Sequence, residues 1–445
     1  MKAVAPMRIA LLTPGTGHFH CGSCLRDGAL ATALRALGHD VRVVPLYLPL
    51  WLEDDSPDAV EPVRMGGINV FLQHKLPPLR RLPGFVADAL DSPALLRWAA
   101  RRGNMTDPAG LGAVTLAVLE GERGALATEI DKLARRAFPA GEEPDVVILS
   151  NAMLLGTARS LRERLDRPLV CTLQGEAPFL DGLPEPYRER AWACVRERAA
   201  DADACIAVSA DYGALMAERL ALPAGKVTVV HNGVAAEDLL ALTGAWNGDT
   251  PPLPRIGYLA RMCPDKGLDT LVEAFVLLCE KGRVGEARLA VAGTLLAGDR
   301  AFVDGLRARL DRAGLTDRVA FHPGVTREEK VRLFDSLAVL SVPATYGESF
   351  GLYVLEALAA GVPVVQPRHA AFPELVEATG GGVLCEPDDP VALADALEAL
   401  LLDPARARAL AESGRDAVRE RFGAEHMARG VADVCTMLAR RPDTP

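Results

Sequence analysis

The amino-acid sequence predicts an α/β protein with two doubly wound, Rossmann-like parallel-sheet domains that face a central cleft. Short apolar runs alternate with longer helical patterns along both halves of the chain, as in sheets with crossover helices. At 445 residues with 49% apolar content, the chain can bury two cores of about 200 residues each. Pro251, Pro252 and Pro254 break both periodicities near the middle, which indicates a domain boundary there.

Segments with the strand pattern occur in both halves, and helical patterns such as Leu268–Lys281 and Arg300–Ala313 separate them. The strand candidates are Arg8–Thr13, Val41–Tyr47, Asp145–Ser150, Pro168–Leu173, Ala204–Ser209, Val227–Val230, Arg255–Leu259, Arg288–Ala292, Val319–His322, Val339–Val342 and Val362–Gln366. We therefore predict a first domain over residues 1–235 and a second over residues 250–415. A last helical pattern, Ser413 to Arg440, has no strand after it, so we expect the segment 416–445 to pack back on the first domain.

Composition and charge exclude several classes of protein. The net charge of −10 disfavours a protein that coats nucleic acid, because neutralising the backbone needs a basic face. Nine cysteines, several inside apolar runs such as Leu169–Cys171, are typical of buried thiols in a reducing compartment. The N-terminus lacks the pattern of a signal peptide, and no apolar stretch is long enough to span a bilayer. We therefore predict a cytoplasmic protein with no nucleic-acid partner.

Two carboxylates, Glu348 and Glu356, lie eight residues apart where a loop is expected to turn into a helix. Both could face a ligand at the helix N-terminus, where the backbone N–H groups of Phe350, Gly351 and Leu352 favour an anion. A sugar nucleotide, with its hydroxyls and phosphates, suits that arrangement. An ordinary amphipathic helix with a solvated glutamate fits the same spacing.

Two cations follow the first strand candidate of the second half. Arg261 and Lys266 lie five residues apart in the segment Ile256–Gly267, where a strand leads into a helix and where an open α/β sheet presents ligand-binding groups. Arg261 can clamp a phosphate in a bidentate way, and Lys266 can add a point charge. A solvated lysine in an ordinary turn is the alternative interpretation of Lys266.

Together these motifs resemble the retaining nucleotide-sugar glycosyltransferases of family 4, which have the GT-B fold. The resemblance rests on Arg261 and Lys266 in their loop, on Glu348 and Glu356, and on the Ala359–Val365 segment that follows. Three first-half segments are similar to further landmarks of the family: Leu37–Val41, Ala207–Ser209 and Val230–Val234. The resemblance covers nearly the whole chain.

The resemblance implies transfer of a hexosyl unit from a UDP- or GDP-sugar to a hydroxyl of a glycan, lipid or small molecule, with retention of the anomeric configuration. It implies no cofactor and no metal ion. Breaking the anomeric bond leaves negative charge on the phosphate and positive charge on the sugar. Fixed cations and a nearby carboxylate stabilise these charges, which makes Arg261, Lys266 and Glu348 catalytic candidates.

The same resemblance implies the contacts of the donor. Arg261 and Lys266 would hold the pyrophosphate, and Glu356 would bind the ribose hydroxyls. Glu348 would contact sugar hydroxyls near C3 or C4. The backbone of Ser349, Phe350, Gly351 and Leu352 would line the sugar and phosphates, and the base would lie near His322 to Val325.

The first half departs from the family in the loop after its first strand candidate. The position of the family's glycine-rich loop falls on Cys21-Gly22-Ser23-Cys24, where Gly22 would still let the backbone approach the donor phosphates. Cys21 and Cys24 could instead form a redox or zinc half-site. His18 and His20 are acceptor-site candidates, although a histidine in such a loop is often structural.

A second departure is Gln174, which stands where family members often carry a histidine. A glutamine cannot act as a base, but its amide can orient a sugar hydroxyl, so Gln174 is a further catalytic candidate. Glu176, an acceptor-site candidate, or a backbone carbonyl could supply the missing function. These departures place the acceptor chemistry, rather than the donor site, in question.

Several alternatives stay open. A non-catalytic sugar-nucleotide-binding protein would bind the donor without breaking it, and a sugar-nucleotide epimerase or a phosphorylase could share the fold. A nicotinamide-dependent dehydrogenase is disfavoured, because Gly15-x-Gly17 is followed by His20 and the second strand candidate ends without a carboxylate. The basic, apolar segment Lys75 to Arg102 fits either peripheral contact with the inner face of a membrane or a solvated helix pair.

Overall fold

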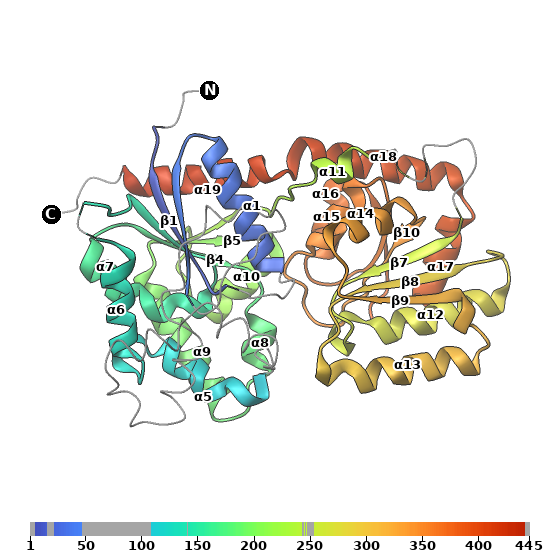
Figure 1. Ribbon diagram of the computed structural model, residues 1–445, viewed down its shortest axis with the longest axis horizontal. Coiled ribbons are helices and arrows are strands. Elements are labelled where there is room, and N and C mark those ends of the chain that lie inside the picture. Colours follow the sequence, from blue (N-terminus) through green and yellow to red (C-terminus); the bar gives the residue numbers. More distant parts are fainter. Residues whose placement is uncertain are drawn as a thin grey trace. The chain divides into compact units, whose positions relative to one another are not determined.

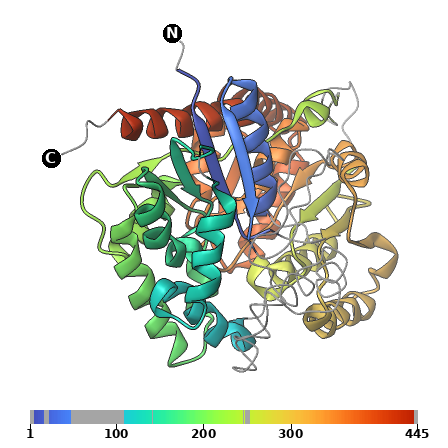
Figure 2. The ribbon, with the colours of Figure 1, turned by 60° about the vertical axis from the view of Figure 1, so that its left-hand side comes forward.

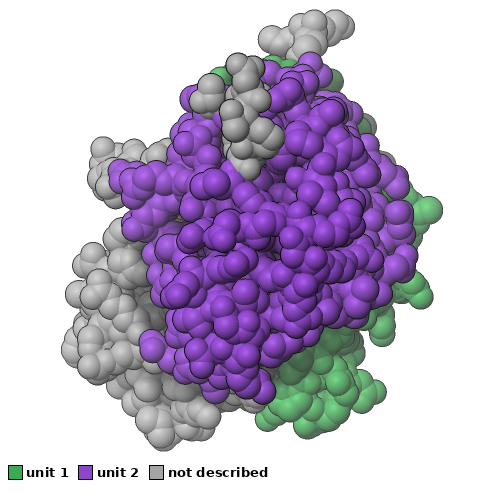
Figure 3. All heavy atoms as spheres, turned by 90° about the vertical axis from the view of Figure 1, so that its right-hand side faces the viewer, with its two compact units in different colours: residues 1–231, 424–445 green, residues 232–423 purple. Residues whose placement is uncertain are grey.

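A computed structural model describes residues 5–15, 22–46, 108–139, 141–242, 244, 246 and 253–440. The chain forms two compact units, residues 1–231 with 424–445 and residues 232–423, which Figure 3 distinguishes by colour. Each unit contains a six-stranded sheet whose described pairings are all parallel. The predicted pair of doubly wound α/β domains is therefore confirmed. His18, His20, Cys21 and the segment Lys75 to Arg102 lie outside the described residues.

Unit 1 has the strand order β2-β1-β3-β4-β5-β6 (Figure 1). Its strands are β1 (Arg8–Thr13), β2 (Asp40–Pro45), β3 (Val146–Leu149), β4 (Leu169–Leu173), β5 (Ala204–Ala207) and β6 (Val227–Val229). Its helices are α1 (Gly22–Ala36), α5 (Pro108–Leu119), η3 (Gly121–Arg123), α6 (Ala127–Ala137), η4 (Ala152–Thr157), α7 (Ala158–Leu165), α8 (Ala177–Asp181), α9 (Tyr187–Arg198), η5 (Ala199–Asp201), α10 (Ala210–Arg219) and α19 (Ala424–Ala439).

The central strands of unit 1 are buried along their whole length, as β3 and β4 show, because helices cover both faces of a parallel sheet. Alternate residues of each strand share a face. Ile9 and Leu11 of β1 and Val146 and Ile148 of β3 enter one core with side chains of α1 and α19. The last helix thus packs on the first one, side by side in Figures 1 and 2, which confirms that the C-terminal helix returns to the first domain.

The helical pattern at the C-terminus is two helices rather than one. Helix α18 (Pro404–Arg421) belongs to unit 2 and α19 to unit 1. The break falls at Phe422 and Gly423, where the Phe422 carbonyl accepts from the Val234 amide (3.0 Å) and Gly423 forms a bridge with Val234. A single helix from Ser413 to Arg440 was therefore a wrong prediction, because tertiary pairing interrupts a continuous helical pattern.

Unit 2 has the strand order β12-β11-β10-β7-β8-β9. Its strands are β7 (Arg255–Leu259), β8 (Arg288–Gly293), β9 (Val319–Pro323), β10 (Val339–Leu340), β11 (Val364–Pro367) and β12 (Gly382–Cys385). Its helices are α11 (Glu237–Leu240), η7 (Pro264–Lys266), α12 (Leu268–Lys281), η8 (Ala297–Asp299), α13 (Arg300–Arg312), η9 (Thr316–Arg318), α14 (Arg327–Asp335), α15 (Leu352–Ala359), α16 (Phe372–Thr379), α17 (Pro390–Leu401) and α18. Ile256, Tyr258 and Leu289 share its core with α12 and α17.

The described helices include none that is both long enough and apolar enough to cross a membrane.

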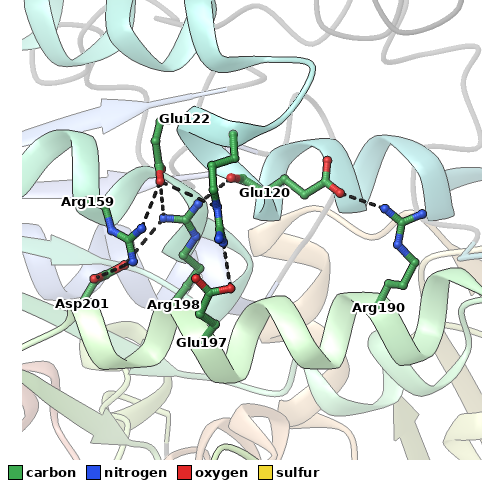
Figure 4. A network of polar contacts seen from close by, with 8 residues as sticks. Glu120, Glu122, Arg159, Arg190, Glu197, Arg198 and Asp201 are labelled. Atoms are coloured by element: carbon green, nitrogen blue, oxygen red, sulfur yellow. Dashed lines mark hydrogen bonds and ion pairs between the residues drawn. The ribbon is translucent and has the colours of Figure 1, made fainter.

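A network of ion pairs ties η3 to α7, α9 and η5 within unit 1 (Figure 4). The Glu122 Oε1 atom accepts from Arg198 Nη1 at 2.9 Å and from Arg159 Nη1 at 3.2 Å. Arg159 also pairs with Asp201 at 3.1 Å. The Arg198 side chain is fully buried, whereas the outer pair of the network, Arg123 and Glu197, is about half exposed.

Replacing Glu122 by glutamine is expected to destabilise unit 1 by about 1–2 kcal/mol, because the buried Arg198 loses its nearer charged acceptor and is left with the more distant Asp201 carboxylate at 3.7 Å. The matched control is Glu197→Gln, at the exposed edge of the same network, for which we expect no resolvable loss. Chemical denaturation of both variants measures the difference. Equal stability of the two variants would show that burial of Arg198 does not determine how much each ion pair of the network stabilises unit 1.

Candidate active site

The loop after β7 carries both predicted phosphate cations. The Tyr258 hydroxyl donates to the Arg261 carbonyl (2.7 Å), and the Met262 amide donates to the Thr294 carbonyl (2.9 Å), which fixes the loop against its neighbour. Gly267 follows Lys266 with a φ of +65°, and a Cβ there would lie 1.8 Å from the Pro343 carbonyl oxygen. Only glycine therefore allows this loop to approach the loop that carries Glu348.

Arg261 is engaged by a carboxylate that sequence reasoning missed. Its Nε lies 2.7 Å from Asp299 Oδ2, and its Nη2 lies 3.0 Å from Asp299 Oδ1. Asp299 ends η8, just beyond β8, and its side chain is almost completely buried. Asp299 uses the bidentate edge of Arg261 that we predicted for a phosphate. Among the residues that the structure describes, none pairs with Nη1, which leaves this nitrogen for a ligand. A charged residue shortly after a parallel strand was the available signal.

Lys266 and Glu348 form an ion pair in the middle of the site. The Lys266 Nζ atom lies 2.6 Å from Glu348 Oε2 and also donates to the Tyr346 hydroxyl. Burial alone would lower the pKa of Lys266, but the adjacent Glu348 carboxylate raises it above its ordinary value. Two residues predicted for different parts of the donor, the pyrophosphate and the sugar, are thus direct neighbours.

The helix after this loop, α15, begins at Leu352 and carries Glu356. In the part of the chain that the structure describes, the amide N–H groups of Gly351 and Leu352 donate to no protein acceptor. Ser349 and Phe350 are buried beside them. Unpaired amides at a helix N-terminus favour an anion, as expected for a backbone that lines phosphates.

Glu356 is held by two cations of α14. Its Oε1 atom lies 2.7 Å from Lys330 Nζ and 3.6 Å from Arg327 Nη1. Arg327 in turn pairs with Asp238 at 2.6 Å. Neither Lys330 nor Arg327 was predicted, because a spacing of more than twenty residues carries no pairing signal. Val325 lies in the loop between β9 and α14, two residues before Arg327.

Unit 1 holds the acceptor-side candidates, and Gln174 directs its amide nitrogen inward. Its Nε2 donates to Asp27 Oδ1 (3.2 Å) and to the Ser150 carbonyl. Asp27 is fully buried next to Arg26, and burial raises the pKa of this carboxyl against the opposing effect of Arg26. Sequence reasoning did not single out Asp27.

Glu176 is buried and holds the turn after β4 together. Its Oε1 accepts from the Ala152 amide (2.7 Å), and its Oε2 accepts from the Gln174 and Gly175 amides (both 3.0 Å) and from the Tyr212 hydroxyl (2.9 Å). These bonds engage both carboxylate oxygens.

Of the segment Cys21–Cys24, the structure describes Gly22, Ser23 and Cys24. Gly22 is the exposed first residue of α1, and Cys24 is buried with its Sγ 3.7 Å from the Thr13 hydroxyl. Across the described ranges, no group of three or more His, Cys, Asp and Glu side chains could hold a metal ion.

Acid is expected to weaken unit 2 through Glu348. Burial alone would raise the pKa of this carboxyl, but Lys266 and the hydrogen bonds to it lower the pKa below its ordinary 4.5. A carboxyl with a depressed folded-state pKa stabilises the fold above the unfolded-state pKa, and this contribution is lost as pH falls through the folded-state pKa. Denaturation of wild type and Glu348→Gln between pH 3 and pH 7 should show a shallower acid slope in the variant. The control, Glu286→Gln at an exposed site, should keep the wild-type slope.

Comparison with solved structures identifies the fold of this protein. Two solved structures with 20% sequence identity share the fold along nearly the whole chain. Sucrose-phosphate synthase from Thermosynechococcus elongatus has a TM-score of 0.69 and covers 97% of this chain and 99% of its own. Anabaena Alr3699/HepE in complex with UDP and glucose has a TM-score of 0.65 and covers 97% and 100%. The two-domain fold is that of the GT-B glycosyltransferases.

Family models match both halves of the sequence. Residues 28–233 match the glycosyl transferase 4-like domain, and residues 250–417 match the glycosyl transferases group 1. The chain belongs to the family 4-type glycosyltransferases, which confirms the resemblance in the motifs.

Curated relatives agree with this membership. The chain is 32% identical over 262 residues to D-inositol 3-phosphate glycosyltransferase of Xylanimonas cellulosilytica, covering 52% of this chain and 61% of the relative. It is 31% identical over 220 residues to the lipopolysaccharide core biosynthesis mannosyltransferase LpcC of Rhizobium leguminosarum bv. viciae, covering 47% and 60%. The chain spans about three fifths of the length of these relatives.

Proposed function

We propose that this protein transfers a hexosyl unit from a UDP- or GDP-sugar to an acceptor hydroxyl, with retention of configuration and without a metal ion. The observation that carries the proposal is the ion pair of Lys266 and Glu348, with Arg261 on the same loop after β7 and with the unpaired amides of Gly351 and Leu352 at the start of α15. Cations and amides suit the diphosphate, and the carboxylate suits sugar hydroxyls.

In this reaction the bond between the anomeric carbon and the diphosphate oxygen breaks, and a bond to the acceptor oxygen forms. The acceptor hydroxyl loses its proton to the departing phosphate. Arg261 and Lys266 stabilise the negative charge on the leaving group, while Glu348 stabilises positive charge on the sugar ring. Glu356, fixed by Lys330, binds the ribose hydroxyls.

One relative is named for D-inositol 3-phosphate and the other for lipopolysaccharide core biosynthesis, so polyol phosphates and glycans are the first acceptors to test. Peripheral contact with anionic lipid is a further proposal, and flotation with liposomes at low salt tests it.

A non-catalytic sugar-nucleotide-binding protein is the second candidate, because Gln174 cannot act as a base. Calorimetric titration with UDP, GDP and ADP and their glucose, N-acetylglucosamine and mannose conjugates tests both candidates. Micromolar binding of one nucleotide and its sugar, followed by donor turnover in EDTA with an acceptor, supports the transferase. Binding without turnover across an acceptor screen favours the binding protein, and no binding contradicts both.

A further inference from the structure

Three hydrogen-bond donors converge on one oxygen of Glu348. Its Oε2 atom accepts from Lys266 Nζ at 2.6 Å, from the Tyr353 hydroxyl at 3.0 Å and from the Tyr346 hydroxyl at 3.1 Å. The other oxygen, Oε1, accepts no hydrogen bond from any residue that the structure describes. The two carboxylate oxygens are therefore in unequal positions, one fully engaged and one available.

The donors come from separate elements that pack around the carboxylate. Lys266 ends η7, Tyr346 lies in the loop before Glu348, and Tyr353 lies in the first turn of α15. The Lys266 ammonium also lies 4.7 Å from the ring centroid of Tyr346 and 5.7 Å from that of Tyr353. A cation between two aromatic rings and a carboxylate has little freedom to move.

The backbone and the ring of this cluster are fixed as well. The Glu348 carbonyl accepts from the Ala371 amide (3.3 Å). The Tyr353 ring packs against Phe372, with centroids 6.5 Å apart, and Phe372 is fully buried. Burial raises the pKa of the Tyr353 hydroxyl, and the Glu348 carboxylate raises it further, so the hydroxyl stays protonated and keeps its role as a donor.

We propose that Tyr346 and Tyr353 are positioning residues for recognition of the donor sugar. By occupying Oε2 they turn Glu348 so that Oε1 alone meets the ligand. An ionised oxygen that accepts but never donates selects a hexose with a free hydroxyl at that point. A deoxy or O-alkylated sugar would leave the oxygen without a donor. This inference rests on the proposed function, because it assigns the sugar subsite of the same site.

Tyr353→Phe gives the sharpest test, because Phe keeps the ring that packs on Phe372 and removes only the hydroxyl. The readout is the affinity for UDP-glucose relative to UDP, and for GDP-mannose relative to GDP, measured by calorimetry. We expect Tyr353→Phe to weaken the nucleotide sugar by about tenfold, the usual effect of one charged hydrogen bond, and the free nucleotide by less than about twofold. Tyr346→Phe should change the same ratio in the same direction.

A double-mutant cycle separates positioning from a general structural role. In a Glu348→Gln background, Tyr353→Phe should change nucleotide-sugar affinity by less than about twofold, because both substitutions act through one carboxylate. The matched control is Tyr212→Phe, which removes a buried tyrosine–glutamate bond in unit 1 and should leave the donor ratio unchanged. Thermal unfolding of each variant verifies that it folds.

Some results of these experiments would overturn the inference alone, and another would overturn the proposed function with it. If wild type binds a nucleotide and its sugar but Tyr353→Phe weakens both equally, or neither, the inference is overturned while the proposed function stands. A full tenfold effect that persists in the Glu348→Gln background also overturns it. If wild type binds none of the four ligands, the proposed function is overturned, and the inference with it.

Discussion

Lys266→Ala is expected to reduce donor affinity at least about a hundredfold and to destabilise unit 2 by about 3–5 kcal/mol. The substitution removes the cation paired with Glu348 and leaves a buried carboxylate whose remaining partners are neutral hydroxyls. Breaking a buried pair from one side costs about that much. The uncompensated carboxylate would also repel the diphosphate of the donor, so binding weakens for two reasons.

Calorimetry with the nucleotide that wild type binds measures the first effect, and chemical denaturation measures the second. Glu356→Ala should also weaken nucleotide binding, through the ribose. Lys281→Ala is the matched control, because Lys281 belongs to the same unit but pairs at the surface with the exposed Asp395. Unchanged nucleotide affinity in Lys266→Ala would remove this residue from the donor site.

Truncation after Gly423 is expected to prevent unit 1 from folding. Helix α19 contributes seven buried residues to the core that it shares with α1: Met427, Ala428, Val431, Ala432, Val434, Cys435 and Leu438. Its four large apolar side chains contribute about 1.5–3 kcal/mol each, or roughly 6–12 kcal/mol together. That sum is comparable to the whole stability of an ordinary domain, about 5–15 kcal/mol.

Calorimetric unfolding tests this expectation. The truncated chain should lose the transition of unit 1 and keep that of unit 2. A chain ending at Arg440 should behave as wild type, since it retains all of α19. Two intact transitions in the shorter chain would show that α19 is dispensable for the first core.

The periodicity of apolar residues predicted most of the fold. Strand β1 and helix α12 have the bounds that the sequence pattern predicts, because a buried parallel strand and an amphipathic helix each leave a local signal. Strand β12 was missed, since Gly382–Cys385 is a short run directly after two glycines. The break between α18 and α19 was also missed, because the bridge from Val234 to Gly423 spans most of unit 2 in sequence.

The candidate site was predictable only in part. Arg261, Lys266, Glu348 and Glu356 belong to compact motifs, and the motifs point to phosphates and hydroxyls. Their roles stay predictions. The partners that hold them, such as Asp299 and Lys330, lie far away in sequence and meet them only through the fold. Tyr353 lies inside the motif itself, but its hydroxyl chemistry has no signature in a helical pattern.

The bond between Val234 and Phe422 has a practical consequence for protein engineering. It brings the first and last segments of unit 2, residues 232–423, together. The chain therefore enters and leaves this unit at neighbouring positions. A domain whose ends meet can be inserted, exchanged or circularly permuted with little disturbance. We therefore expect unit 2 to fold when it is expressed alone and to accept exchange for the corresponding half of a relative.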